Sequence, residues 1–227
     1  MRQLVLFDID GTVLSGGPAK KAFLVALVEV FGTAGPIQEW EFSGKTDPQI
    51  ARELLTEAGI EQGQIDGGLP EVWERYLAEM KTRLPSCPTR PLPGVKELLV
   101  QLEATHTVAL GLLTGNVVEG ARLKLESAGL APWLSIGAFG SDHEDRNELP
   151  FIAIQRAEEH WGVRFSSDEV VVVGDTPRDV DCGRTHGTRT VAVATGRFGF
   201  DALCETDADT VLESFKETDC ALTAILR

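Results

Sequence analysis

Two acidic segments of the sequence carry side chains suited to metal binding and acid–base chemistry. The first, DIDGT, places Asp8 and Asp10 directly after a short apolar run. The second, GDTPRD, places Asp175 and Asp179 after another apolar run. A carboxylate at the end of a buried strand must find a partner or a cation, because an uncompensated buried charge is costly. Each segment alone also fits a polar turn, since Asp and Gly are common turn residues.

A third segment, LLTGN, has groups that could hold an anion. Here an apolar run ends at Thr114, Gly115 and Asn116, and a helical pattern follows. A hydroxyl group and the free N–H groups before a helix can bind a negatively charged oxygen. Thr or Asn in this place also serves as an ordinary helix N-cap. This segment alone therefore leaves both interpretations open.

The acidic side chains are expected to converge in space. In open α/β sheets the residues at the carboxyl ends of the strands form the sites, which brings together Asp8, Asp10, Asp175 and Asp179. Four carboxylates at one edge repel one another unless a cation lies among them. Oxygen ligands favour Mg²⁺ over zinc or copper. The sequence therefore predicts a magnesium site.

The elements that must position these groups are short strands of a parallel sheet. Five apolar runs rich in β-branched residues are nearly continuous rather than alternating, as in a sheet covered on both faces. They span residues 4–7, 108–113, 136–139, 170–173 and 190–193. Helical patterns separate the later runs, so the sequence predicts a Rossmann-like α/β fold.

The first two runs are too far apart for a single crossover. About 100 residues separate them, where a crossover needs only a dozen or more. We expect a small all-helical cap domain at 16–89, inserted into an α/β core formed by 1–15 and 90–227. A Ser-Gly-Gly-Pro stretch would form a flexible linker from the core into the insert, and four prolines between 85 and 93 would form a stiff linker from the insert back to the core.

Three stretches of the insert have helical patterns. Residues 19–31 are amphipathic. Asp47 and Pro48 fit an N-cap and a first-turn proline of a helix that stops at Gly59. An apolar stripe at 72–80 marks a third helix. The insert is therefore expected to be helical.

Composition excludes several classes of protein. The chain has 227 residues, of which 43% are hydrophobic and 25% charged, as in ordinary globular proteins. Its formal charge of −14 would repel nucleic acid on average. The four cysteines form no CxxC pair, which favours reduced residues in a cytoplasmic protein. We expect neither a signal peptide nor a transmembrane span, and no pattern indicates an oligomeric state.

The combination of motifs resembles the haloacid dehalogenase superfamily, specifically its phosphatases with a helical cap after the first strand. DIDGT is similar to the family's first motif, LLTGN to its second and GDTPRDV to its fourth. The resemblance covers essentially the whole chain. It implies a Rossmann-like core and Mg²⁺-dependent hydrolysis of phosphate esters.

The same resemblance implies roles for individual residues. Asp8 would be the nucleophile that takes the phosphoryl group, and Asp10 the general acid and base. Thr114 would hold a phosphoryl oxygen, with Gly115 and Asn116 beside it. Mg²⁺ would bind Asp8, the carbonyl group of Asp10 and Asp175, and Asp179 would lie next to these ligands.

The third motif departs from the family pattern. Many relatives have a lysine followed by two prolines, whereas this chain has DRNELP at 145–150. Arg146 could supply the cation, because a guanidinium group binds phosphate through two N–H groups. Lys124 is the alternative. Arg146 also fits an ion pair on a surface loop, and Lys124 also fits a solvated helix face. Of the two residues, we favour Arg146 as the cation of the third motif.

The insert offers one further cation. Lys45 lies in a segment with Trp40 and Phe42 that could reach over the site and contact the substrate, as could Arg52. The aromatic residues also fit the core of the insert, and Lys45 a solvated position. Both interpretations stay open.

The predicted function is Mg²⁺-dependent hydrolysis of a small phosphorylated metabolite through an aspartyl phosphate. A sugar-phosphate mutase shares the motifs. A phosphonatase would form a Schiff base with a lysine of the cap, for which Lys45 is a candidate, and a dehalogenase would expel halide. The presence of an acid at position 10, Asp10, argues against both of these enzymes. From another class, a receiver-like signalling module would be about half this length and needs no cap.

Overall fold

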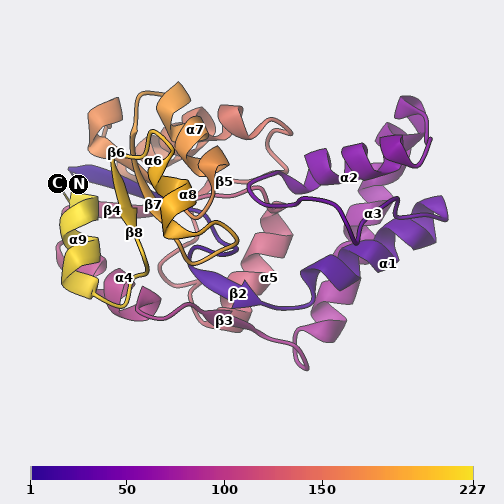
Figure 1. The fold of residues 1–227 in the computed structure, drawn as a ribbon, viewed down its shortest axis with the longest axis horizontal. Coiled ribbons are helices and arrows are strands. Elements are labelled where there is room, and N and C mark those ends of the chain that lie inside the picture. Colours follow the sequence, from indigo (N-terminus) through magenta and orange to yellow (C-terminus); the bar gives the residue numbers. More distant parts are fainter. Residues whose placement is uncertain (1, 227) are drawn as a thin grey trace.

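A six-stranded parallel sheet forms one part of the molecule (Figure 1). The computed structural model describes residues 2–226. The strand order is β5-β4-β1-β6-β7-β8, so β1 lies in the middle of the sheet. The strands are β1 (Gln3–Phe7), β4 (Val108–Leu113), β5 (Gly137–Ala138), β6 (Val170–Gly174), β7 (Arg189–Val193) and β8 (Thr210–Leu212). This arrangement confirms the expected α/β fold with a parallel sheet.

Helices cover both faces of this sheet. Successive side chains of a strand point to opposite faces, so Val5 and Phe7 pack into one apolar cluster and Leu4 and Leu6 into another. The first cluster contains residues of α4 (Val95–Ala104), α5 (Val118–Ala128) and α9 (Thr218–Leu226). The second contains residues of α6 (Leu149–Trp161) and α7 (Pro177–Thr185). Burial on both faces explains the continuous apolar runs.

Three long helices follow β1 in the chain and lie to one side of the sheet (Figure 1). They are α1 (Ala19–Phe31), α2 (Asp47–Glu57) and α3 (Gln62–Arg83). We call residues 19–83 the helical insert. Its buried apolar side chains pack mainly against one another, with Val117 of the sheet region added to the cluster. The insert therefore has a core of its own.

Two short strands replace the linkers expected at the ends of the insert. β2 (Leu14–Gly16) pairs antiparallel with β3 (Thr89–Pro91). The prediction of a flexible exit and a stiff return is wrong at these residues, because the two segments form a ribbon with each other. Three-residue strands with few apolar side chains leave no periodic pattern in the sequence.

The start of α2 corrects the prediction that Asp47 is its N-cap. The N-cap is Thr46, whose hydroxyl oxygen accepts a hydrogen bond from the N–H of Gln49 at 3.2 Å. Asp47 is the first helical residue, and Pro48 follows it. The carboxylate of Asp47 is therefore not needed to cap the helix.

The third helix of the insert is longer than its apolar stripe. α3 contains Pro70 and three glycines, which disfavour a helix and conceal the pattern. A Cβ atom at Gly68 would lie 2.4 Å from the ring of Phe31, so close packing of α3 on α1 explains one of these glycines. Within residues 2–226, each helix is too short or too polar to span a lipid bilayer.

The remaining elements are short. They are α8 (Phe200–Cys204) and the 3-10 helices η1 (Arg146–Glu148) and η2 (Ser167–Glu169). The predicted strand at 136–139 is reduced to β5, and β8 was not predicted because its three residues are only half-buried.

Replacing Gly94 by Ala should destabilise the fold strongly. Gly94 is the N-cap residue of α4, with a φ of 86°, and a Cβ atom would lie 2.0 Å from the backbone oxygen of Phe215. Gly59 is the matched control, because its φ is 79° and no atom lies within 4 Å of its Cβ position. Urea denaturation should give a loss of about 1–2 kcal/mol for Gly59→Ala, the cost of the left-handed backbone, and a clearly larger loss for Gly94→Ala. Equal losses would show that the clash with Phe215 is relieved without cost.

Candidate active site

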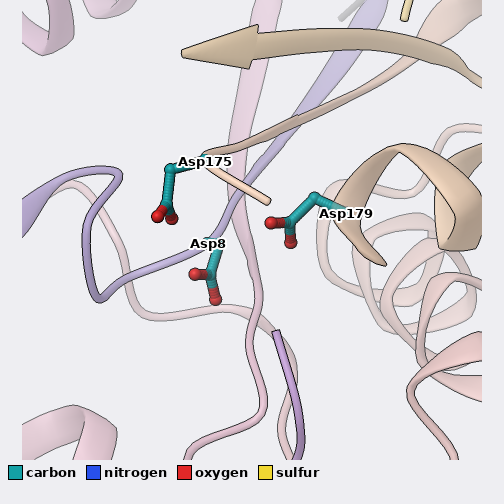
Figure 2. Close-up of side chains that lie close together, drawn as sticks. All are labelled: Asp8, Asp175 and Asp179. Carbon is teal, nitrogen blue, oxygen red and sulfur yellow. The ribbon is translucent and has the colours of Figure 1, made fainter. Parts of the chain in front are cut away.

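Three carboxylates converge, two of them from neighbouring strand ends and one from a helix (Figure 2). Asp8 directly follows β1, Asp175 follows β6, and Asp179 lies in the first turn of α7. β1 and β6 are paired in the sheet with Phe7 opposite Val173, so both acidic segments begin at the same level. Each carboxylate offers an oxygen atom, and these atoms lie within 4.8 Å of one another. All three side chains are buried.

The cluster carries more negative charge than its surroundings neutralise. Burial raises the pKa of Asp175, and the charges of Asp179 and Asp8 raise it further. Burial also raises the pKa of Asp8, although Arg146 opposes this effect. The hydroxyl group of Thr12 donates a hydrogen bond of 2.9 Å to Asp175, which favours the charged carboxylate and lowers its pKa against these larger effects.

The surroundings of Asp175 fit a divalent cation. A Cβ atom at Gly11 would lie 2.4 Å from its carboxylate oxygen, and one at Gly196 would lie 1.7 Å away. Both glycines let the backbone enclose this carboxylate closely. An oxygen-only set of buried ligands with excess negative charge suits Mg²⁺ rather than a softer metal.

Arg146 is buried beside this cluster rather than on the surface. It begins η1, and its side chain is 6% exposed. One guanidinium nitrogen, Nη2, donates to Asp179 at 2.6 Å, to Asp8 at 3.1 Å and to the carbonyl oxygen of Leu113 at 3.1 Å. Burial disfavours the charged form, but attraction to Asp179 and Asp8 outweighs it and raises the pKa of Arg146. Arg146 is therefore a permanent positive charge next to Asp8.

Lys124 is also buried at the site, against a different carboxylate. Its Nζ donates to Oδ2 of Asp10 and to Oδ1 of Asn116, both at 2.6 Å. The Asn116 amide donates in turn to Asp10 and to the hydroxyl oxygen of Thr114, both at 2.8 Å. Lys124 thus does not lie on a solvated helix face. The structure therefore places both candidate cations at the site, where Arg146 contacts Asp8 and Lys124 contacts Asp10.

The segment after β4 is not a helix cap. Val117 is the N-cap of α5, and its side chain makes no capping hydrogen bond. A Cβ atom at Gly115 would lie 2.1 Å from the backbone oxygen of Lys45, so the helical insert contacts the backbone here. Gly115 also accepts a hydrogen bond of 2.7 Å from the N–H of Asp47. This close contact joins the insert to the edge of the sheet.

Lys45 is held within the insert. Its Nζ forms an ion pair with Glu53 and lies 5.5 Å from the centre of the Trp40 ring. Trp40 and Phe42 pack partly buried against the core of the insert. Arg52 pairs with Glu144 and Asp66, both at 2.8 Å, and does not line the site.

A cavity of about 340 Å³ connects these groups. Its walls come from the sheet edge on one side and the helical insert on the other. The side chains from the sheet region are Asp8, Asp10, Asn116, Lys124, Arg146, Asp175, Thr176 and Arg197, and those from the insert include Lys20, Phe23, Phe42, Lys45, Asp47, Ile50 and Tyr76. A space of this size is at the small end of ligand sites in proteins.

Sequence reasoning missed two polar residues of the site. Asp47 was assigned to a helix cap, but its Oδ2 accepts a hydrogen bond of 2.8 Å from the N–H of Val117, and burial raises its pKa to about 6. Thr12 is part of DIDGT, and its contact with Asp175 depends on the pairing of β1 with β6. The only signal for Asp47 in the sequence is that Thr46, directly before it, can cap the helix and so leaves the carboxylate of Asp47 without that role.

Comparisons with known proteins agree with this arrangement. A sequence model of haloacid dehalogenase-like hydrolases matches residues 5–193. The chain is 28% identical over 229 residues to a phosphoglycolate phosphatase of Synechococcus elongatus, with 99% of each protein covered. It is 27% identical over 199 residues to an N-acetylmuramic acid 6-phosphate phosphatase of Pseudomonas aeruginosa, covering 86% of this chain and 82% of that one. The fold resembles the crystal structure of a hydrolase from Pseudomonas syringae, with a TM-score of 0.72, 19% identity and 99% of each chain covered.

Removing the Arg146 guanidinium should destabilise the protein at neutral pH. Asp8 and Asp179 would lose their buried countercharge, and breaking a buried pair costs about 3–5 kcal/mol. Arg122→Ala is the control, because Arg122 pairs with Glu119 and Glu126 on the surface and should lose about 1 kcal/mol or less. Urea denaturation of Arg146→Ala and Arg122→Ala without added metal measures the difference. Similar losses for the two variants would show that Arg146 does not compensate buried charge.

Proposed function

The chain belongs to the haloacid dehalogenase-like hydrolases, and from this we propose that it hydrolyses the phosphomonoester of a small metabolite with the help of Mg²⁺. The family membership confirms the resemblance found in the sequence motifs. The observation that carries the proposal is the buried carboxylate of Asp8, which faces the cavity between a guanidinium group and two further carboxylates. The expected class of enzyme, a phosphatase, agrees with the names of the curated relatives.

The proposed metal site consists of oxygen atoms from three residues. Asp8, Asp175 and the backbone carbonyl group of Asp10 would hold Mg²⁺, with Asp179 beside them. Bound there, the ion would neutralise charge on the phosphoryl oxygens. Asp179 also accepts hydrogen bonds from the N–H and hydroxyl groups of Thr176, at 3.0 and 2.7 Å, which fix its orientation.

In the proposed first step, a carboxylate oxygen of Asp8 attacks phosphorus and the bond to the ester oxygen breaks. Asp10 donates a proton to the departing oxygen, which leaves as an alcohol. Its side chain is 46% exposed and lines the cavity, so it can reach the substrate. Arg146 donates to Asp8 and to the transferring group, and the N–H of Gly115 to a phosphoryl oxygen. Thr114, which the sequence motif predicts to hold a phosphoryl oxygen, is fully buried and does not line the cavity, and its hydroxyl oxygen accepts from the Asn116 amide.

In the second step, a water molecule attacks the phosphorus atom of the aspartyl phosphate. Asp10, now deprotonated, accepts a proton from the water, and the bond between phosphorus and Asp8 breaks. The products are inorganic phosphate and the regenerated carboxylate. Lys124 and Asn116 hold Asp10 through the hydrogen bonds described above and so keep it directed at the cavity.

The size of the cavity supports a small substrate. Residues 16–89 would act as a cap over a core formed by 1–15 and 90–227, and the cap excludes water and macromolecules during transfer. The cavity of 340 Å³ accommodates a small metabolite. Lys45 lines it and is a candidate substrate contact, while the charge of −14 disfavours nucleic acid.

Release of phosphate from p-nitrophenyl phosphate tests this function. The protein is expected to release inorganic phosphate when Mg²⁺ is present, to lose this activity in EDTA and to regain it when Mg²⁺ is restored in excess. The reason is that the three carboxylates cannot accept a negatively charged ester without a cation. Asp8→Asn is the control for contaminating phosphatases, because it keeps the shape of the side chain and removes the nucleophile. Unchanged activity in EDTA would contradict the metal site, and phosphate release by Asp8→Asn at the wild-type rate would contradict the nucleophile.

A further inference from the structure

One carboxylate oxygen of the cavity has no task in phosphoryl transfer. Asp47 is fixed to the sheet region at two points, since its N–H donates to Gly115 and its Oδ2 accepts from Val117. Within residues 2–226, the structure gives no hydrogen-bond partner to Oδ1 of Asp47. The residue lines the cavity, so this oxygen is available as an acceptor for a bound molecule.

A donor lies close to this acceptor. Lys124 is 4% exposed, and its ammonium group has three N–H donors, of which Asp10 and Asn116 take two. Lys124 and Asp47 line the same cavity, and Nζ of Lys124 contacts Asn116, which lies in the chain between the two residues that hold Asp47. One donor of Lys124 and one acceptor of Asp47 are thus free at the same part of the cavity. A hydroxyl group, which both donates and accepts, fits such a pair.

The position of Lys124 places this hydroxyl group near the scissile bond. Its Nζ is 2.6 Å from Asp10, the group that protonates the ester oxygen in the proposed reaction. A hydroxyl group bound to Lys124 would therefore lie a few ångströms from the ester oxygen. A hydroxyl on the carbon atom next to the ester carbon meets this requirement.

The charges around the cavity disfavour a carboxylate in this position. A second anion would lie next to Asp47 and Asp10, and like charges in a buried site repel strongly. Two of the other cations that line the cavity are already neutralised, Lys45 by Glu53 and Arg197 by Glu41.

A third cation of the lining, Lys20, also has contacts within the insert. Its Nζ donates to the carbonyl oxygen of Gln38 at 3.3 Å and lies 4.9 Å from the centre of the Phe42 ring. Apolar side chains of Phe23, Ile50 and Tyr76 complete the insert side of the cavity and suit a carbon skeleton.

Building on the proposed phosphatase activity, we propose that Asp47 and Lys124 bind a hydroxyl group of the alcohol part of the substrate. The preferred substrates would then be phosphate esters of polyols or sugars with a hydroxyl group next to the esterified carbon. Asp47 would be the residue that selects them over esters that carry a carboxylate at that place.

Three two-carbon esters test this selection. Ethyl phosphate lacks a further polar group, 2-hydroxyethyl phosphate carries a hydroxyl group, and phosphoglycolate carries a carboxylate. We expect kcat/KM of the wild-type protein with Mg²⁺ to be about tenfold or more higher for 2-hydroxyethyl phosphate than for the other two, the effect of a hydrogen bond to a charged group. A wild-type preference for phosphoglycolate, or equal values for all three, would overturn the proposal.

The variant Asp47→Asn isolates the role of the carboxylate. The amide oxygen can still accept from Val117, but the amide nitrogen then presents a donor to the cavity beside the donor of Lys124. The preference for 2-hydroxyethyl phosphate over phosphoglycolate should fall by about tenfold. Glu57→Gln is the matched control, since Glu57 is exposed on the same helix and does not line the cavity; it should keep the wild-type preference.

The result distinguishes the two proposals. An unchanged preference in Asp47→Asn, or the same shift in Glu57→Gln, would overturn the role of Asp47 while leaving the phosphatase function intact. If the wild-type protein released phosphate from none of the three esters nor from p-nitrophenyl phosphate, the phosphatase function itself would fail. Circular dichroism of each variant verifies that it is folded.

Discussion

Buried negative charge at one edge of the sheet is the constraint on which the rest of the site depends. The pairing of β1 with β6 brings Asp8 and Asp175 together, and α7 adds Asp179. Carboxylates in such a place are tolerated only with compensating positive charge. Arg146 supplies part of it from a 3-10 helix far along the chain, and the enclosed space around Asp175 suits a divalent cation for the remainder.

The helical insert completes the site by direct contact with this edge. Gly115 lies against the backbone of Lys45, and Gly44 lies against Thr176, where a Cβ atom would be 2.5 Å from the hydroxyl oxygen. The hydroxyl group of Thr46 adds a hydrogen bond of 2.6 Å to the carbonyl oxygen of Glu144. These contacts hold the insert against the sheet edge, and the cavity lies between the two.

The sequence predicts the groups that follow long buried strands, because apolar runs and the positions after them are local patterns. Asp8 and Asp175 are of this kind. Arg146 and Lys124 are buried because η1 and α5 meet the carboxyl edge of the sheet. This tertiary arrangement cannot be read from a local pattern in the sequence. Asp47 was misassigned because Thr46 and Asp47 are both good N-caps, and the three-residue strands β2, β3 and β8 are too short to show a period.

The most direct test of the account is to locate the phosphoryl group during turnover. An Asp10→Asn variant, which lacks the base for the second step, can be mixed with Mg²⁺ and p-nitrophenyl phosphate, quenched in acid and digested for peptide mass spectrometry. We expect a phosphorylated peptide with the modification on Asp8, absent when EDTA replaces Mg²⁺ and absent in the Asp8→Asn, Asp10→Asn double variant. Modification of a different residue, or a phosphopeptide that forms equally without Asp8, would contradict it.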